Sequence, residues 1–199
     1  MIITTEEPRH SAAIEALLDQ SFGTDRHTKT AYRLRDTVAP LSDLGLVALE
    51  HDDHGEEVLQ GTIRYWPISI SGFVPALLLG PIAVAPHLQG AGLGSKLIRM
   101  SLNKAAAAGH RIVLLVGDAP YYSRFGFTRR LTMDLQLPGP VDLDRFLGLE
   151  IVPGALDGVS GMITPWTGTA TEDLAIPVPG AFATPAGFAQ TRLWYARPA

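Results

Sequence analysis

The chain has 199 residues, of which 46% are hydrophobic, and carries a formal net charge of −4 at pH 7. This length and apolar content suit one domain with a single core. The acidic balance argues against nucleic acid as a partner, since binding to phosphate backbones needs clustered lysine and arginine.

The chain contains no cysteine, which excludes disulfides, thiolate metal sites and a cysteine nucleophile. Residues 1–8 lack the charged segment and apolar core of a secretion signal. The longest apolar stretch, residues 74–86, is interrupted by proline and glycine and is too short to cross a bilayer. We therefore expect a cytoplasmic protein with no membrane partner.

The first part of the chain predicts a strand followed by two helices. The strand covers residues 2–5, and Pro8 suits the first turn of the next helix. Apolar residues of that helix recur at helical spacing, at Ile14, Leu17, Leu18 and Phe22. A weaker helical pattern covers residues 28–38 and ends at Pro40.

Two antiparallel strands are predicted next, over residues 45–51 and 58–66, joined by the turn Asp52-Asp53-His54-Gly55. In the second strand, Leu59, Gly61, Ile63 and Tyr65 share one face, and Gln60, Thr62, Arg64 and Trp66 share the other. His51 and His54 have no third partner that would define a zinc geometry, so we predict no metal site.

A glycine-rich turn joins the next strand to a helix. The apolar run over residues 77–84 predicts a buried strand, and a helical pattern runs from residue 92 to residue 108, with Gly109 as its stop. Between them lies Gln89-Gly90-Ala91-Gly92-Leu93-Gly94. The glycines let the main chain approach a ligand closely, and the free N–H groups of a first helical turn favour phosphate.

Two common nucleotide loops do not fit this spacing. A Walker loop needs Gly-Lys-Ser/Thr, but the order here is Gly94-Ser95-Lys96, and no second glycine stands five residues before Gly94. The dinucleotide pattern G-x-G-x-x-G is met by Gly90 and Gly92, but Ser95 occupies its last place. The spacing that does fit is Gln/Arg-x-x-Gly-x-Gly/Ala.

A second motif follows the helix. Residues 111–116 predict a buried strand, which runs into Gly117-Asp118-Ala119-Pro120-Tyr121-Tyr122-Ser123-Arg124-Phe125-Gly126-Phe127. With both motifs present, the chain resembles the GCN5-related N-acetyltransferases (GNAT superfamily). The second string is similar to that of one bacterial branch of these proteins, with Gly-Asp, paired tyrosines and Arg-Phe-Gly-Phe.

The resemblance implies an α/β GNAT fold, with a mixed central sheet splayed between strands 4 and 5 and helices on both faces. We expect residues 1–137 to form the acetyltransferase core and residues 138–199 to form a C-terminal extension packed on it. Beyond Phe127, strands are expected over residues 132–137 and 159–164, and a helical turn over residues 142–147. Its aromatic residues either wall the acceptor pocket or close a homodimer; these are Trp166, Phe182, Phe188, Trp194 and Tyr195.

The resemblance also implies that acetyl-CoA is the cosubstrate and that no metal is needed. The pyrophosphate is expected on the main chain of Gln89, Gly90, Ala91, Gly92, Leu93, Gly94 and Ser95. The pantetheine arm is expected along the open edge of the strand at Ile82, Ala83 and Val84, where a main-chain N–H stabilises the developing oxyanion. Tyr122 is the expected acid, because a phenol placed at the sulfur can return a proton to the leaving thiolate.

The general base is left open by the sequence. Many family members carry a carboxylate on the central strands, but residues 77–84 and 111–116 contain none. Glu57, Asp118, a histidine or an ordered water are the alternatives. For Asp118 the preferred interpretation is a cap of the short helix that follows it. Arg124 either steers phosphate or is a surface residue.

Two functions are compatible with these residues. The favoured one is transfer of an acetyl or another short acyl group from CoA to a primary amine of a small molecule or protein, by direct attack. The alternative is a non-catalytic CoA-binding sensor or scaffold, which the absence of a strand carboxylate favours.

Overall fold

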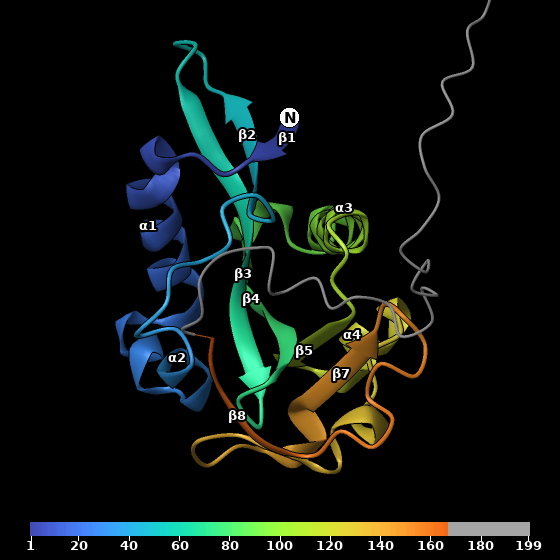
Figure 1. The fold of residues 1–199 in the computed structure, drawn as a ribbon. Helices are drawn as coiled ribbons and strands as arrows, with labels where there is room; N and C mark the ends of the chain where they lie inside the picture. The colour runs from blue at the N-terminus through green and yellow to red at the C-terminus, as the bar shows by residue number, and fades with distance from the viewer. Residues whose placement is uncertain (167–199) are drawn as a thin grey trace, which may run out of the picture.

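The computed structural model describes residues 1–166, which form a mixed sheet with helices on both faces (Figure 1). The strands are β1 (Ile2–Thr5), β2 (Leu46–His51), β3 (Glu57–Ile70), β4 (Val74–Val84), β5 (Ile112–Val116), β6 (Leu135–Gln136), β7 (Phe146–Glu150) and β8 (Gly161–Pro165). The helices are α1 (Ser11–Phe22), α2 (Thr30–Arg33), α3 (Leu93–Ala107) and α4 (Ala119–Tyr122). None of these helices is long and apolar enough to cross a bilayer.

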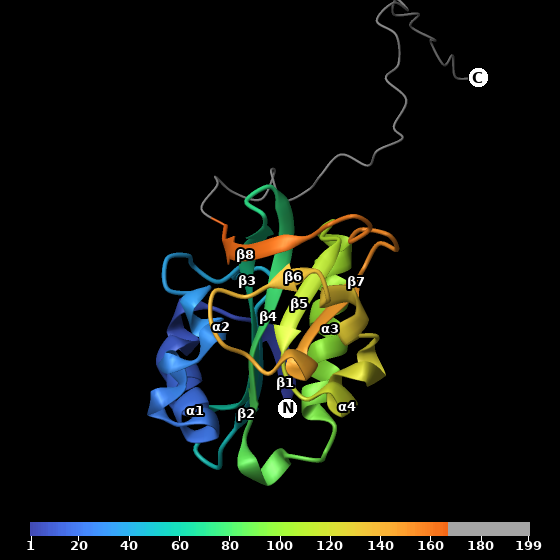
Figure 2. The ribbon, with the colours of Figure 1, turned by 90° about the horizontal axis from the view of Figure 1, so that it is seen from below.

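The sheet has the strand order β1-β2-β3-β4-β5-β7. Strand β8 lies outside this order and pairs with residues 68–70 of β3. The β4–β5 pair is parallel, whereas β1–β2, β2–β3, β3–β4 and β5–β7 are antiparallel. Figure 2 shows α1 and α2 on one face of the sheet and α3 on the other. This arrangement is the predicted α/β GNAT fold.

The parallel strands β4 and β5 separate after a short contact. They pair only at Leu77 with Val113 and at Leu78 with Leu114, although β4 has 11 residues. On its other side β4 follows β3 to its end, with a bulge in which Gly80 and Pro81 stand opposite one β3 residue. A bulge bends the strand that carries it, so the carboxyl half of β4 leaves β5 as the splayed sheet predicts.

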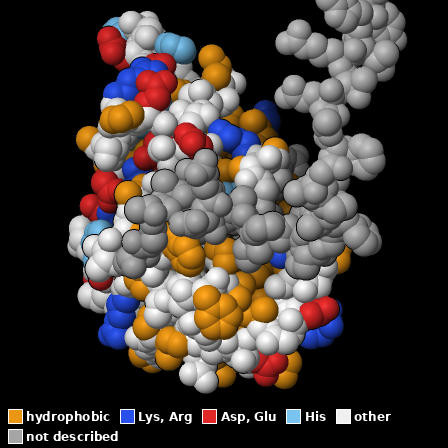
Figure 3. All heavy atoms as spheres, in the orientation of Figure 1, with side chains coloured by type: hydrophobic (Ala, Val, Ile, Leu, Met, Phe, Trp, Pro, Cys, Tyr) orange, Lys and Arg blue, Asp and Glu red, His pale blue; other side chains and the backbone are white. Residues whose placement is uncertain are grey.

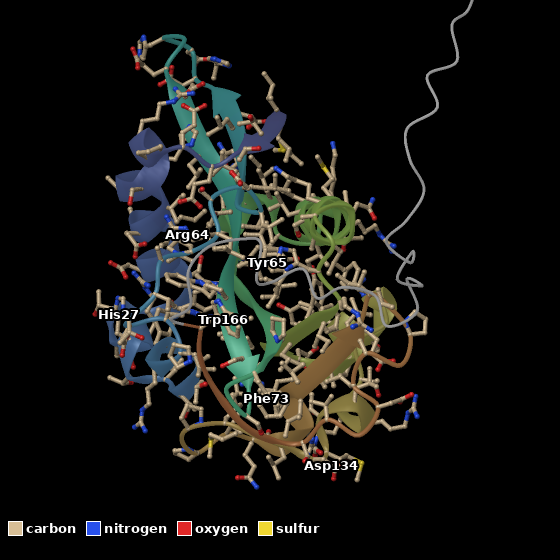
Figure 4. All side chains as sticks on the ribbon, in the orientation of Figure 1. His27, Arg64, Tyr65, Phe73, Asp134 and Trp166 are labelled. Carbon is tan, nitrogen blue, oxygen red and sulfur yellow. The ribbon has the colours of Figure 1, made fainter. Side chains whose placement is uncertain are left out.

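The two faces of β3 carry different partners. Tyr65 donates or accepts a buried hydrogen bond with Ser101 on α3, at 2.9 Å, whereas Arg64 pairs with Glu15 on α1. Figure 4 shows these neighbouring side chains pointing to opposite sides of β3. Successive residues of a strand alternate between its faces, as the sequence of this strand predicts.

The hydrophobic core has a separate cluster on each face of the sheet. On the α3 face, Leu97 and Ile98 pack with Ile63 and Tyr65, and on the other face Ile14 and Leu18 of α1 pack with Val47. A third cluster surrounds Leu34, behind α2, and reaches Phe146 of β7.

Most predicted elements of the first 120 residues are present, and Gly109 takes the left-handed conformation at the end of α3, with φ of 83°. The helix predicted over residues 28–38 was wrong in extent, because α2 has only four residues. Its surroundings explain this: Leu34 packs into the core directly after the helix, and Arg35 turns toward aromatic rings. Tertiary contacts therefore replaced a continuous helix.

The predictions after residue 127 are partly wrong. Instead of a strand over residues 132–137, a 3-10 turn ends at Thr132, whose hydroxyl bonds to Phe146 O, and only Leu135–Gln136 are extended. The predicted helical turn is a 3-10 turn, Leu143–Arg145, which leads into β7, a strand that the sequence did not indicate. The strand predicted over residues 159–164 is present as β8.

Both β7 and β8 belong to the same sheet as the preceding strands, since β7 pairs with β5 and β8 with β3. The domain division at residue 137 stays a prediction. Of the aromatic residues expected to pack on the core, only Trp166 lies within the described residues. Its main-chain N–H donates to Pro67 O at 3.1 Å. The other four lie outside them.

Charged and hydrophobic side chains occupy different parts of the surface in Figure 3. Acidic and basic side chains gather over α1 and the β2–β3 end, where Arg9 pairs with Glu7 and Glu57. Hydrophobic side chains gather at the opposite end, where Phe73 in the β3–β4 turn is 73% exposed.

Candidate functional site

The separation of β4 from β5 leaves one edge of β4 open. From Leu79 to Val84, β4 has β3 on one side, and no strand in the described part of the chain pairs with its other side. Main-chain N–H and C=O groups on an unpaired strand edge can bond to an added extended segment. Ile82, Ala83 and Val84 lie on this edge. The Ala83 side chain is buried against α1, so only its main chain is available there.

The glycine-rich turn continues from this edge. A 3-10 turn, Pro86–Leu88, is followed by Gly90 and Gly92, both left-handed with φ of 82° and 89°. These conformations suit glycine because a Cβ would strain them. The N–H groups of these two glycines have no hydrogen-bond acceptor among residues 1–166.

Helix α3 supplies further free donors at its start. Its first main-chain bond runs from Lys96 N–H to Gly92 O, at 3.0 Å, so the N–H groups of Leu93, Gly94 and Ser95 precede the helical ladder. Free N–H groups and the positive end of the helix dipole together favour a phosphate.

These donors surround a hollow of about 300 Å³. Its lining is Val84, Leu88, Gln89, Gly90, Gly92, Leu93, Gly94, Ser95, Tyr121 and Arg124. Most of the residues expected from the sequence to hold the cofactor therefore lie together. Three of the expected residues do not line the hollow: Ile82 and Ala83, which precede Val84 on β4, and Ala91, whose N–H donates to Leu88 O at 3.2 Å. The Gln89 side chain donates to Val84 O at 3.3 Å, which ties the turn back to the strand end.

The two adjacent tyrosines of α4 point in different directions. Asp118 caps this helix by accepting from Tyr121 N–H at 3.1 Å, which confirms the preferred interpretation of that residue. The Tyr121 hydroxyl lies 2.9 Å from the place that a Cβ on Gly94 would occupy, so it stands over the start of α3. The sequence did not assign Tyr121 to the hollow, although the paired tyrosines were its signal.

Tyr122 lies on the β5 side of the opening. Its ring packs over Gly117, where a Cβ would collide with it, and stands edge-on to Phe127 with centroids 5.9 Å apart. Burial raises the pKa of Tyr122 to about 12, and the neighbouring Tyr121 acts in the same direction. The phenol therefore keeps its proton at neutral pH and is able to donate it.

Arg124 is held against the hollow. Its Nε donates to Tyr121 O at 3.1 Å, and its guanidinium lies 4.4 Å from the centroid of the Tyr121 ring. Arg124 is thus an exposed residue that also lies beside the free N–H groups of the turn, and a role in steering phosphate stays a prediction.

The candidates for the general base do not gather at this site. Glu57 is bonded to Arg9 near the β2–β3 turn, and the Asp118 carboxylate is used as a cap. His87 is exposed in the turn after β4, and His110 is buried at the far end of α3. None of the four lines the hollow. Within residues 1–166, no three His, Cys, Asp or Glu side chains are grouped as metal ligands.

Comparisons with known proteins agree with this geometry. Residues 43–129 match the acetyltransferase (GNAT) domain. The uncharacterized N-acetyltransferase YhbS of Escherichia coli K12 is 32% identical over 164 residues, which cover 82% of this chain and 95% of that protein. The chain belongs to the GNAT family of N-acetyltransferases.

Solved GNAT structures share the fold. The crystal structure of YhbS from E. coli in complex with CoA superposes with a TM-score of 0.67 and 30% identity, over 82% of this chain and 88% of that chain. A GNAT acetyltransferase from Brucella melitensis in complex with acetyl-CoA gives a TM-score of 0.56 and 28% identity, over 82% and 94% of the two chains. Membership of this family makes the protein an N-acetyltransferase.

Proposed function

We propose that this protein transfers the acetyl group of acetyl-CoA to a primary amine of a small molecule or protein, by direct attack of the amine. The observation that carries the proposal is the set of free main-chain N–H groups at Gly90 and from Gly92 to Ser95, which adjoins the open edge of β4. Both GNAT relatives named above were solved with CoA or acetyl-CoA.

The residues present fit this cosubstrate. Free N–H groups at the start of α3 and the Arg124 guanidinium suit a diphosphate. The main chain of Ile82, Ala83 and Val84 suits the amide groups of a pantetheine arm. When bound, acetyl-CoA supplies an activated acetyl thioester.

Two groups of this chain stabilise or neutralise the negative charge that develops during the transfer. A main-chain N–H at the end of β4 stabilises the negative charge that develops on the carbonyl oxygen. Tyr122 donates its phenolic proton to the departing thiolate, because a buried tyrosine with a raised pKa is protonated at working pH. A water accepts the proton that the attacking amine loses, since no described carboxylate lines the hollow.

Two measurements test the proposal. Acetyl-CoA at a hundredfold excess over its Kd is expected to stabilise the fold by roughly 2.7 kcal/mol, seen as a raised melting temperature. Turnover is measured as free thiol released from acetyl-CoA with a panel of amines. A raised melting temperature without turnover of any amine would favour a CoA-binding sensor, and no stabilisation at all would contradict the cosubstrate assignment.

A further inference from the structure

The guanidinium of Arg35 lies beside β4, on the face of the sheet opposite α3. Arg35 follows α2, and its guanidinium lies 4.4 Å from the centroid of the Tyr32 ring and 5.9 Å from that of Trp66. One terminal nitrogen lies 3.5 Å from the place that a Cβ on Gly80 would occupy, so the side chain reaches the bulge of β4. The open edge of β4 begins at this point.

Arg35, which is half-buried, lacks the ion pairs that the two buried arginines on this face make. Arg26 bonds to Asp19 and Glu15, and Arg64 bonds to Glu6 and Glu15. No carboxylate among residues 1–166 lies within ion-pair distance of Arg35. A cation that is partly removed from water and lacks a counter-ion is costly, which indicates that its partner is absent from the described part of the chain.

Unused donors accompany this charge. The Nε atom of Arg35 is buried and has no acceptor, and the same holds for the indole nitrogens of Trp66 and Trp166. Trp66 adjoins Arg35, and Trp166 is bonded through its main chain to Pro67, the next residue of β3. Burial lowers the pKa of Arg35 to about 10, so the guanidinium is still a cation at neutral pH. The group that it lacks is therefore an anion with hydrogen-bond acceptors.

We propose that Arg35 binds a carboxylate of the acetyl acceptor, which makes the acceptor an amino carboxylate such as an amino acid or a peptide end. This inference rests on the function proposed above and names its substrate class. The acceptor approaches from the α2 face, and the acetyl donor is held from the α3 face.

The spacing along β4 suits this class of acceptor. The Arg35 guanidinium lies beside Gly80, and the segment assigned to the thioester arm begins at Ile82. Two residues of an extended strand span at most about 7 Å, and the bulge at Gly80 and Pro81 shortens this distance. An amine a few bonds from a carboxylate can therefore reach the transfer point while the carboxylate bonds to Arg35, and a guanidinium can hold a carboxylate with two parallel bonds.

The test compares amines that differ only in the carboxylate: L-lysine with 1,5-diaminopentane, and L-ornithine with 1,4-diaminobutane. In the wild-type protein, the carboxylated member of a pair is expected to give a kcat/KM at least tenfold higher. In Arg35→Met, kcat/KM for the carboxylated member is expected to fall roughly 10- to 100-fold, the range of a charge-assisted hydrogen bond. The diamines are expected to change less than threefold.

Arg33→Met is the matched control. Arg33 is the last residue of α2, two positions before Arg35; it is exposed and donates to Pro138 O. This variant is expected to keep both the preference and the rates of the wild type. Arg35→Met is expected to keep or raise the melting temperature, because an apolar chain replaces a half-buried cation that has no counter-ion. A structural role for Arg35 through its aromatic contacts predicts a lower melting temperature instead.

Binding without turnover separates this inference from the proposed function. Calorimetric titration of L-lysine and 1,5-diaminopentane into protein saturated with CoA reports acceptor binding directly. Tighter binding of L-lysine that is lost in Arg35→Met supports the carboxylate site even if no acetyl transfer is seen. Equal responses to both members of each pair, including no response to either, overturn it, even if other amines are acetylated.

Discussion

The polar groups on the two faces of the central sheet come from different parts of the chain: main chain on one face and side chains on the other. On the α3 face, the donors around the hollow are main-chain N–H groups of a glycine-rich turn and a helix start. On the α1/α2 face, the charged groups are arginine side chains from the turn after α1, the segment after α2 and strand β3. The comparison teaches that a site made of main chain is encoded locally, whereas a site made of side chains depends on which partners the fold supplies.

The largest expected effect tests whether side-chain pairs hold the α1/α2 face together. Arg64→Met leaves Glu6 buried without its partner; the two side chains are only 7% and 11% exposed. Removing one member of a buried pair costs about 3–5 kcal/mol, measured by urea unfolding. Arg9→Met is the control, since its pair with Glu57 is exposed and is worth at most about 1 kcal/mol. Equal losses in the two variants would contradict this description of the face.

The next effect concerns the acid on the other side of the opening. Tyr122→Phe is expected to lower kcat by roughly 100-fold, the scale of general acid catalysis, as measured by thiol release. Tyr121→Phe is the control: its hydroxyl stands over Gly94, so KM for acetyl-CoA is expected to rise while kcat changes little. A kcat of Tyr122→Phe within twofold of wild type would show that another group donates the proton.

The pH profile sharpens the same assignment. Burial raises the pKa of Tyr122 to about 12, so the phenol is protonated, and active as an acid, at all lower pH values. Its activity is lost only as pH rises through about 12. We therefore expect kcat to show no alkaline decrease from this residue between pH 7 and 10. A decrease in that range that disappears in Tyr122→Phe would contradict the raised pKa.

A smaller effect tests the main-chain site on the α3 face. Gly92 and Gly55 both have left-handed conformations, with φ of 89° and 81°, and a Cβ on either would meet nothing within 4 Å. Substitution by alanine costs each about 1–2 kcal/mol of backbone strain. Only Gly92→Ala is expected to weaken acetyl-CoA binding, by roughly tenfold, measured by calorimetry. An equal loss of affinity in Gly55→Ala would mean that strain alone explains the effect.

The smallest effect concerns the far end of α3. Burial lowers the pKa of His110, so the folded protein favours its neutral form. The stability that this gives is present above the unfolded pKa of about 6.5 and is lost as pH falls through the folded value. His110→Gln is expected to show a smaller decrease in melting temperature between pH 7.5 and pH 5. An unchanged decrease would assign the acid sensitivity to other groups.

The sequence by itself determined the glycine-rich turn, the start of α3 and the cap of α4. A left-handed Gly92, the helix start behind it and the Asp118 cap depend on residues close together in the chain, so local preference specifies them. The apolar alternation of β3 likewise fixed which side chains face α3, since a strand has only two faces.

Only the tertiary structure decided the rest. Strand β7 is short and contains Gly148, so its identity comes from pairing with β5. The divergence of Tyr121 and Tyr122 depends on Gly94 and Gly117, which belong to different elements. Arg35 was one basic residue in a helical pattern; in the fold its Nε atom is buried without an acceptor, whereas Arg26 and Arg64 pair with carboxylates. Charge pairing in a folded core is settled by competition among residues far apart in sequence, and a local pattern does not contain that information.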